Sequence, residues 1–198
     1  VYGHPPWALQ KESGAPLNTD DDRMDDVTYA NGVLWASLYS VVRVVGERVN
    51  RSGIAWFAVK PKLEQNLLAQ ANIEDQGYIA VKGEYLLSGT ITVNSKGAGA
   101  IIMTLVGPDY FPSVVYTTFM AESRPRQFSP LHLIAAGTRP AMFGSCLPQY
   151  GGVCTWGDYS AAAIDGLNES IWLAAEYIPG GPVTRYENWG TRILEISS

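Results

Sequence analysis

The sequence predicts an all-β protein, and three observations support this prediction. Charged residues make up only 17% of the 198 residues, whereas about a quarter is usual in a soluble domain. Short apolar runs alternate with Gly-, Pro- and Asn-rich turn signals along most of the chain, a pattern typical of many short strands. A degenerate repeat occurs three times, and each copy consists of a strand, a turn and a second apolar strand.

The spacing of this repeat indicates its architecture. If Trp35, Ile102 and Trp172 are equivalent, successive copies are 67 and 70 residues apart. One four-stranded antiparallel sheet with its loops needs about this length, and such sheets repeated around an axis form a β-propeller. A single hairpin cannot bury both of its faces, so we expect the copies to stack.

The first copy is expected at about residues 20–82, after an extended N-terminal segment at 1–19 that is punctuated by Pro and Gly. Asn31-Gly32 is the strongest hairpin signal in the chain. The apolar spacing within Leu63–Ala71 predicts a helical turn, although a buried loop fits the same pattern. The strands of this copy are expected at Val27–Tyr29, Val33–Ser37, Ile54–Val59 and Gly77–Val81.

The second and third copies are expected at about residues 83–137 and 156–198. The second copy turns at Asn94–Gly97, and its third and outer strands are expected at Ser113–Phe119 and Leu131–Ala135. The third copy has an inner hairpin and a strand at Thr191–Ile196, but no outer strand follows.

Three sheets are fewer than the four to eight that usually close a ring. We therefore expect the chain to form about half of a propeller, with the remaining sheets supplied by a companion chain or by a second copy of this chain. The companion would be the N-terminal half of the same precursor, because Val1 is not a natural start and an upstream segment is expected. A compact β-sandwich of about ten strands is the alternative.

Charge and hydropathy exclude several classes of partner. The formal net charge of −5 disfavours nucleic acid and anionic membranes, because an acidic surface repels phosphate groups. No apolar run approaches the roughly 18 residues of a membrane span, so none is expected.

The two cysteines point to export. Cys146 and Cys154 lie in a loop rich in Gly and Pro, where they can close a small ring. We expect a disulfide and therefore an oxidising, extracellular location; two free thiols in a cytosolic protein are the alternative. Asn50 and Asn168 begin N-x-S sequons in expected hairpin turns, and both would accept glycans in a eukaryotic secretory host.

Several longer segments carry a family resemblance. They are Trp156–Ala163, Ile171–Ile178 and Asn188–Ile193 in the third copy, together with Gly77–Val81 and Thr104–Ser113 earlier in the chain. Together they resemble the C-terminal half of secreted, sialidase-like (BNR-like) β-propeller proteins over most of residues 20–196. The resemblance implies a propeller and export but no particular reaction. The chain departs from true sialidases, since no copy contains their S-x-D-x-G-x-x-W motif.

Three residues are candidates for catalysis. Asp158 either lines the mouth of a central channel as an acid, base or ligand-binding carboxylate, or it caps a turn. Glu176 pairs with Asp158 if their carboxyl groups lie roughly 5–10 Å apart, as glycoside hydrolysis requires, or it is a surface residue. Arg192 either binds a ligand carboxylate in a bidentate manner or forms a salt bridge between sheets.

Aromatic and acidic residues suggest two kinds of binding site. Trp156, Tyr159, Tyr177 and Trp189 are expected at loop edges and strand ends, where they can contact a sugar, although packing between sheets also explains such residues. The acidic run at 20–26 offers Asp20, Asp22 and Asp25 as calcium ligands, or it is a solvated turn.

The sequence thus favours an extracellular, non-catalytic binding or structural module whose ligand is a carbohydrate or another protein. No Walker loop, dinucleotide-binding glycine motif, G-x-S-x-G or H-E-x-x-H motif occurs. The alternative is a glycan-active enzyme, either a sialidase-like hydrolase or a lyase, that uses Asp158, Glu176 and Arg192 at the propeller mouth.

Overall fold

The protein is all-β in the computed structural model, which describes residues 4–24, 26–181 and 189–197. Two short 3-10 helices, η1 (Gly144–Cys146) and η2 (Pro148–Tyr150), lie between β10 and β11. The strands are β1 (Ala8–Gln10), β2 (Ser13–Leu17), β3 (Asp26–Ala30), β4 (Val33–Val42), β5 (Arg51–Glu64), β6 (Leu67–Ile79), β7 (Tyr85–Val93), β8 (Ala98–Val106), β9 (Ser113–Met120), β10 (His132–Ala135), β11 (Ala161–Ile164), β12 (Ile171–Tyr177) and β13 (Gly190–Ile196).

Three antiparallel sheets follow one another along the chain. Sheet 1 contains β3–β6, sheet 2 contains β7–β10, and sheet 3 contains β11–β13, each with its strands in chain order. Asn31 and Gly32 connect β3 to β4 with φ values of 53° and 78°, the left-handed conformation that a two-residue hairpin requires. The hairpins predicted at Asn31-Gly32 and at Asn94–Gly97 are therefore confirmed.

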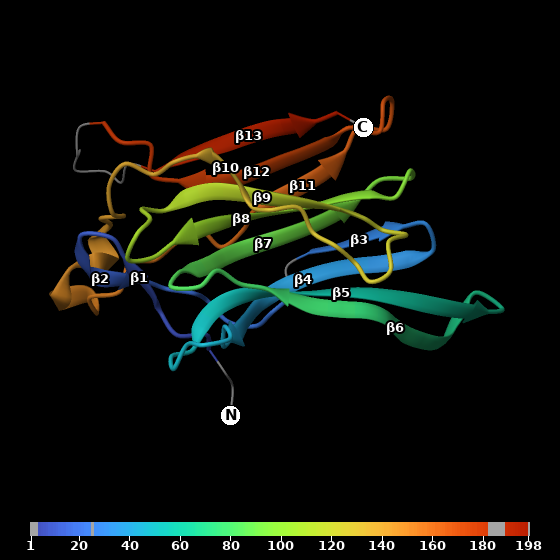
Figure 1. The fold of residues 1–198 in the computed structure, drawn as a ribbon, viewed down its shortest axis with the longest axis horizontal. Helices are drawn as coiled ribbons and strands as arrows, with labels where there is room; N and C mark the ends of the chain where they lie inside the picture. The colour runs from blue at the N-terminus through green and yellow to red at the C-terminus, as the bar shows by residue number, and fades with distance from the viewer. Residues whose placement is uncertain (1–3, 25, 182–188, 198) are drawn as a thin grey trace.

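The three sheets stack in layers, with sheet 2 in the middle (Figure 1). Strand β7 contacts β3, β4 and β5 on one side and β11 and β12 on the other. This arrangement has three layers, whereas the sandwich considered from the sequence would have two. No helix among the described residues is long and apolar enough to cross a membrane.

Each interface between sheets has its own apolar core. Between sheets 1 and 2, buried residues such as Trp35 and Trp56 pack with Ile101 and Met103. Between sheets 2 and 3 the buried core consists of Ala100, Ile102, Val114, Ile171, Leu173 and Ala175. A third cluster joins β1 and β2 to the segment before β11.

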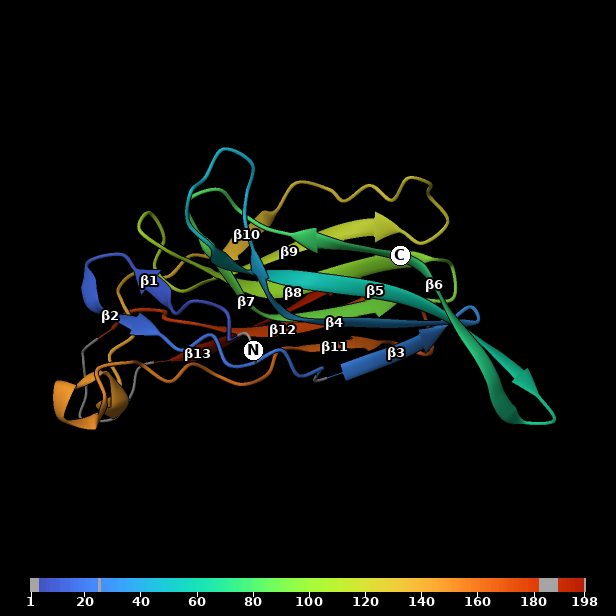
Figure 2. The same cartoon turned by 90° about the horizontal axis from the view of Figure 1, so that it is seen from below.

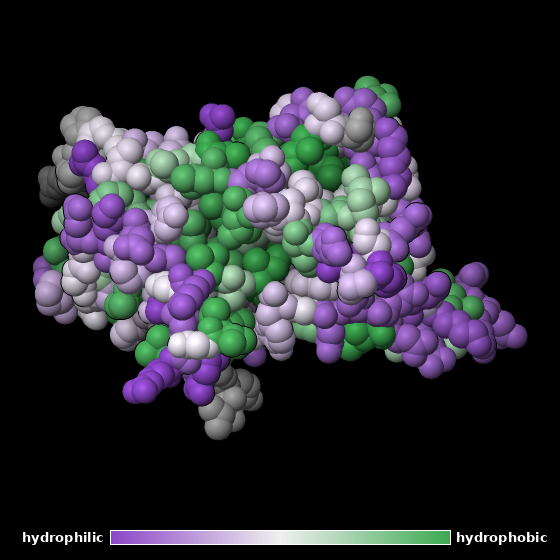
Figure 3. Space-filling model, viewed as in Figure 1, coloured by the Kyte–Doolittle hydropathy of each residue, from purple (hydrophilic) through white to green (hydrophobic). Residues whose placement is uncertain are grey.

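The predicted helical turn at Leu63–Ala71 is wrong. Strands β5 and β6 continue through this region as a hairpin that turns at Gln65 and Asn66. Its end projects beyond the other strands (Figures 1 and 2) and is mostly hydrophilic in the space-filling view, which also shows hydrophobic residues gathered over the middle of the stack (Figure 3). Leu67 is 72% exposed, so no apolar surface is available against which a helix could pack.

The first strands of the sheets are joined by hydrogen bonds from side chains to backbone. The Thr28 hydroxyl donates to the carbonyl of Ile91 at 3.3 Å, and the Asn31 amide donates to the carbonyl of Asn94 at 3.2 Å. Asn94 in turn donates to the carbonyl of Glu169 in sheet 3 at 2.9 Å. These bonds link the first hairpins of sheets 1 and 2, and they join sheet 2 to the β11–β12 loop of sheet 3.

Arg126 fills the space between sheets 1 and 2 near their outer strands. Its guanidinium carbon lies 4.7 Å from the ring centre of Trp35, 5.4 Å from that of Phe119 and 5.5 Å from that of Trp56. Its Nε donates to the carboxylate of Asp75 in β6 at 3.0 Å. The side chain is 1% exposed, and this burial lowers the pKa of the guanidinium although the group stays charged.

We predict that Arg126→Met destabilises the protein by about 2–4 kcal/mol, because it removes a cation from three ring faces and leaves Asp75 unpaired. Chemical denaturation measures this change in the free energy of unfolding. Arg124→Met is the control, since Arg124 is exposed and donates to backbone carbonyls of its own turn. Equal effects of the two substitutions would contradict the assigned role.

Candidate functional site

An open cavity of about 440 Å³ lies at one end of the stack, beside the edge of sheet 3. Its lining residues come from four segments of the chain: Phe143, Thr155, Trp156, Gly157, Asp158, Glu176 and Trp189. Four of these were predicted as site residues from the sequence. The antiparallel pairing brings them together, because the start of β11, the end of β12 and the start of β13 lie at the same end of sheet 3.

The two tryptophans of the cavity have different roles. Trp156 is 7% exposed and packs against Phe143 with ring centres 6.2 Å apart, so it forms part of the cavity's apolar base. Trp189, directly before β13, is 56% exposed and presents indole surface to solvent. Tyr159 is 72% exposed and lines a neighbouring hollow together with Glu176 and Trp189.

Two predicted residues lie elsewhere. Arg192 pairs with Ala175 across β12 and β13, whereas Glu176 pairs with Thr191. Since side chains alternate along a strand, Arg192 lies on the opposite face of sheet 3 from Glu176 and does not line the cavity. Tyr177 also lies on that opposite face, where it packs against the core between sheets 2 and 3.

A glycine brings the two walls of the cavity close together. The carboxylate of Glu176 lies so near the backbone of Gly157 that a Cβ atom there would overlap it. A similar arrangement occurs at the same end of sheet 2, where the carboxylate of Glu84 lies against Gly107. In both sheets, a glutamate carboxylate thus lies against a glycine backbone at the end where the first strand begins and the second strand ends.

The segment that supplies Asp158 is anchored to sheet 2. The hydroxyl of Ser88 in β7 donates to the carbonyl of Gly157 at 3.1 Å, and it lies 2.7 Å from the hydroxyl of Tyr39 in β4. Thr90 donates to the carbonyl of Ser160 at 3.1 Å. The position of the cavity wall therefore depends on the stacking of all three sheets.

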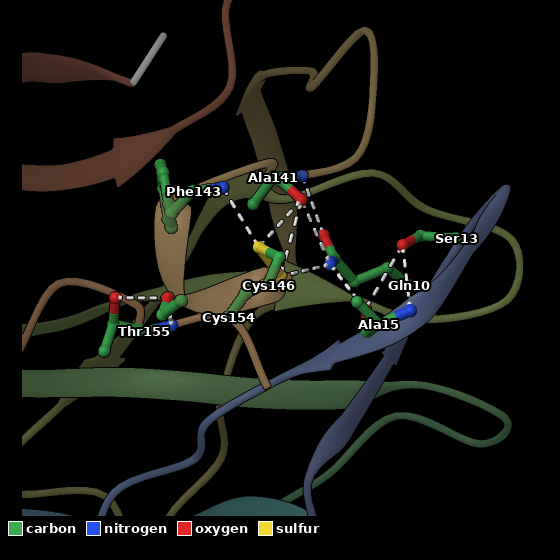
Figure 4. The surroundings of a disulfide bond; sticks show 9 residues. Gln10, Ser13, Ala15, Ala141, Phe143, Cys146, Cys154 and Thr155 are labelled. Atoms are coloured by element: carbon green, nitrogen blue, oxygen red, sulfur yellow. Dashed lines mark hydrogen bonds between the residues drawn. A yellow bond between two sulfur atoms is a disulfide. The ribbon is translucent and has the colours of Figure 1, made fainter. Parts of the chain in front are cut away.

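The predicted disulfide between Cys146 and Cys154 is confirmed, and it supports the same wall. Thr155, which lines the cavity, follows Cys154 directly. Figure 4 shows the Gln10 side chain beside the disulfide, where its carbonyl oxygen accepts from the backbone of Ala141 at 2.8 Å. The backbone N–H of Cys154 donates to the carbonyl of Pro16 in β2 at 2.8 Å, and this bond ties the cavity wall to the β1–β2 hairpin.

The acidic run does not gather around a common point in the part of the chain that is described. The Arg23 guanidinium donates to the carboxylate of Asp21 at 2.7 Å, and this hydrogen bond lowers the pKa of Asp21. The same guanidinium lies 3.6 Å from the carboxylate of Asp20. Among the described residues, no group of three or more His, Cys, Asp and Glu is placed to hold a metal. Of the three predicted calcium ligands, Asp20 and Asp22 are described, whereas Asp25 lies outside the described residues.

Both sequon asparagines are exposed in loops between strands. The carbonyl oxygen of Asn50, between β4 and β5, accepts from Arg43 at 2.9 Å. That of Asn168, between β11 and β12, accepts from the backbone of Ser170 at 2.9 Å. Their location in hairpin loops is as predicted, and glycosylation itself stays a prediction.

Sequence reasoning missed Phe143 and Thr155. Neither lies in the repeat, so repeat spacing gave no reason to select them. The available signal was their position beside the cysteines, because a residue next to a disulfide has a fixed backbone and suits the wall of a site.

Replacing Gly157 by Ala should move the Glu176 carboxylate out of its place without unfolding the protein, since the overlapping atom ends a flexible side chain. Crystallography of the variant and thermal unfolding would measure both effects. Gly166→Ala is the control, because a Cβ atom there meets no neighbour. An unmoved Glu176 would contradict the prediction.

Glu84 is 3% exposed, and its Oε2 has no hydrogen-bond partner among the described residues. Burial, and then the negative charge of Asp109, raise the pKa of its carboxyl group. Because burial penalises the ionised carboxylate, Glu84 lowers the free energy of unfolding at pH values above its raised folded-state pKa. This destabilisation is relieved as the pH falls through that pKa. Glu84→Gln should therefore raise the unfolding temperature at about pH 8 and lose this advantage towards about pH 4. The exposed Glu122→Gln is the control, and an advantage independent of pH would refute the explanation.

Neither protein-family models, nor curated proteins, nor solved structures gave a match to this chain. The resemblance to sialidase-like propellers therefore stays an expectation, and the interpretation of the site rests on its geometry.

Proposed function

We propose that this chain is part of an extracellular β-propeller that binds carbohydrate in the cavity beside sheet 3. The observation that carries the proposal is the gathering of Trp156, Asp158, Glu176 and Trp189 around one open cavity. Its volume of about 440 Å³ is within the range of small-molecule sites, roughly 300–1,000 Å³.

The chemistry of the lining suits a sugar. An exposed indole such as Trp189 offers a flat apolar surface to the C–H face of a pyranose ring. The carboxylates of Asp158 and Glu176 accept hydrogen bonds from sugar hydroxyls, and the Thr155 hydroxyl both donates and accepts. Apolar stacking with a few polar groups at the rim is the usual composition of a ligand site.

The packing of the sheets supports the propeller part of the proposal. Three antiparallel sheets follow in chain order. Hydrogen bonds join the first strands of sheets 1 and 2 and link sheet 2 to the β11–β12 loop, and Arg126 fills the space farther out between sheets 1 and 2. Sheets that are close at one edge and separated at the other fan around an axis, as propeller sheets do. The disulfide supports export, because such bonds persist in oxidising compartments.

A glycan-active enzyme is the second candidate. The observation in its favour is that Asp158 and Glu176, two carboxylates, line the same cavity. Glycoside hydrolysis uses such a pair, one as acid and the other as nucleophile or base. The placement of Arg192 on the other face of sheet 3 removes the guanidinium that a sialidase-like reaction would use.

We predict that Trp189→Ala weakens binding of the best ligand in a glycan panel by roughly tenfold or more, because stacking on the indole is lost. Calorimetric titration measures the affinity. Trp7→Ala is the control, since Trp7 is equally exposed, at 55%, and does not line the cavity. Unchanged binding by the Trp189 variant, or no binding by the parent, would overturn the proposal.

Glu176→Gln separates binding from catalysis. A binding module should show no turnover of the glycan panel in the parent, and the variant should bind with altered affinity. Turnover in the parent that disappears in Glu176→Gln would replace the binding proposal by the enzymatic one.

A further inference from the structure

Sheet 3 has an apolar face that nothing covers in the described structure. Ile171, Leu173 and Ala175 of β12 are buried against sheet 2, so alternation places Trp172 and Ala174 on the opposite face. The strand register sets Ala161, Ala163 and Ile193 beside them, with Glu176 and Glu195 next along the strands. Trp172 is 41% exposed and Ile193 is 60% exposed.

Sheet 1 has a second uncovered apolar face at the other end of the stack. Figure 2, seen from below, looks onto this sheet. Trp35 and Trp56 point towards sheet 2, so the neighbouring positions in each strand point away. These positions include Val27, Tyr29, Leu34, Phe57 and Tyr78, none of them charged; Tyr29 is 64% exposed and Tyr78 is 68% exposed.

Each free face has a counterpart that is buried between two sheets inside the stack. The face of sheet 1 that carries Trp35 packs on sheet 2, and the face of sheet 2 that carries Ile102 packs on sheet 3. Trp172 occupies the equivalent position in sheet 3 and faces outward. Likewise, the outward face of sheet 1 corresponds to the face of sheet 2 that carries Ile101 and Met103.

We infer that a second copy of this chain covers these faces head to tail, with sheet 3 of one copy packed on sheet 1 of the other. This inference rests on the proposed propeller arrangement. Two copies related by a two-fold axis make the contact twice and close a ring of six sheets. Such an assembly continues the interface that already occurs between sheets 1 and 2 and between sheets 2 and 3.

Charge favours this pairing over contacts between like faces. Two copies of sheet 3 packed face to face would bring Glu176 and Glu195 of one copy near those of the other. The outward face of sheet 1 presents uncharged residues instead, so a head-to-tail contact avoids this repulsion. Apolar faces of this kind, rimmed by polar residues, are typical of protein interaction sites.

The contact also completes the proposed carbohydrate site. A hollow of about 280 Å³ lies on the outward face of sheet 3, lined by residues that include Tyr159, Ala161 and Ala174. Glu176 and Trp189 border both this hollow and the larger cavity. Side chains from sheet 1 of the second copy therefore fill the hollow and form a further wall beside the bound sugar.

Light scattering on the purified chain tests the inference. The parent should have twice the 21.5 kDa mass of one chain, and Trp172→Glu and Tyr29→Glu should each be monomeric. An equimolar mixture of these two variants should regain the dimer, because one of its two contacts pairs an intact sheet 3 with an intact sheet 1. Val45→Glu, at a loop position that is 94% exposed, is the control and should stay dimeric.

The other outcomes overturn the inference. A parent of 21.5 kDa shows that no second copy binds, and a dimer that persists in Tyr29→Glu but not in Trp172→Glu shows a contact between two copies of sheet 3. If Trp172→Glu unfolds, as far-UV circular dichroism would reveal, Ile193→Glu replaces it. Glycan titration of the parent is a separate readout: a monomer that still binds sugar refutes the assembly alone, whereas a dimer that binds none refutes the carbohydrate proposal alone.

Discussion

The middle sheet must bury both of its faces, and the rest of the structure depends on this constraint. Nearly every residue of β7 and β8 is buried, so sheet 2 is stable only between two other sheets. Sheets 1 and 3 each need to bury one face, and sheet 2 provides that surface on both sides. The two outer faces are the consequence, because a stack of repeated sheets always ends in two surfaces built like its interior.

The cavity follows from the same stacking. The hydroxyl groups of Ser88 and Thr90 in β7 donate hydrogen bonds to backbone carbonyls of the segment before β11. Sheet 2 therefore positions Asp158, although the segment leads into sheet 3. Glycine at position 157 lets the Glu176 carboxylate approach, and the disulfide at Cys154 fixes the start of the same segment. A change in the packing of sheets 2 and 3 therefore alters the site even where no lining residue changes.

Hairpins and the disulfide could be predicted from the sequence because their signals are local. Asn31-Gly32 specifies a tight turn by itself, and two cysteines in a Gly- and Pro-rich loop close a small ring. The leucines near residue 65 could not be interpreted correctly, since their spacing also fits a helix and only the tertiary structure shows that they project into solvent. The separation of Arg192 from Glu176 depends on strand register, and a shift of one residue would exchange their faces.

Different interactions join sheets 1 and 2 on the side of their first strands and on the side of their outer strands. On the side of their first strands, sheets 1 and 2 lie close, because short threonine and asparagine side chains donate hydrogen bonds directly to the backbone of the neighbouring sheet. Farther out, sheets 1 and 2 are kept apart by a segment that inserts a guanidinium and the ring of Phe128 between them. Short links on one side and a thick filling on the other separate sheets 1 and 2 unequally along their width, which is the arrangement that the proposed propeller requires.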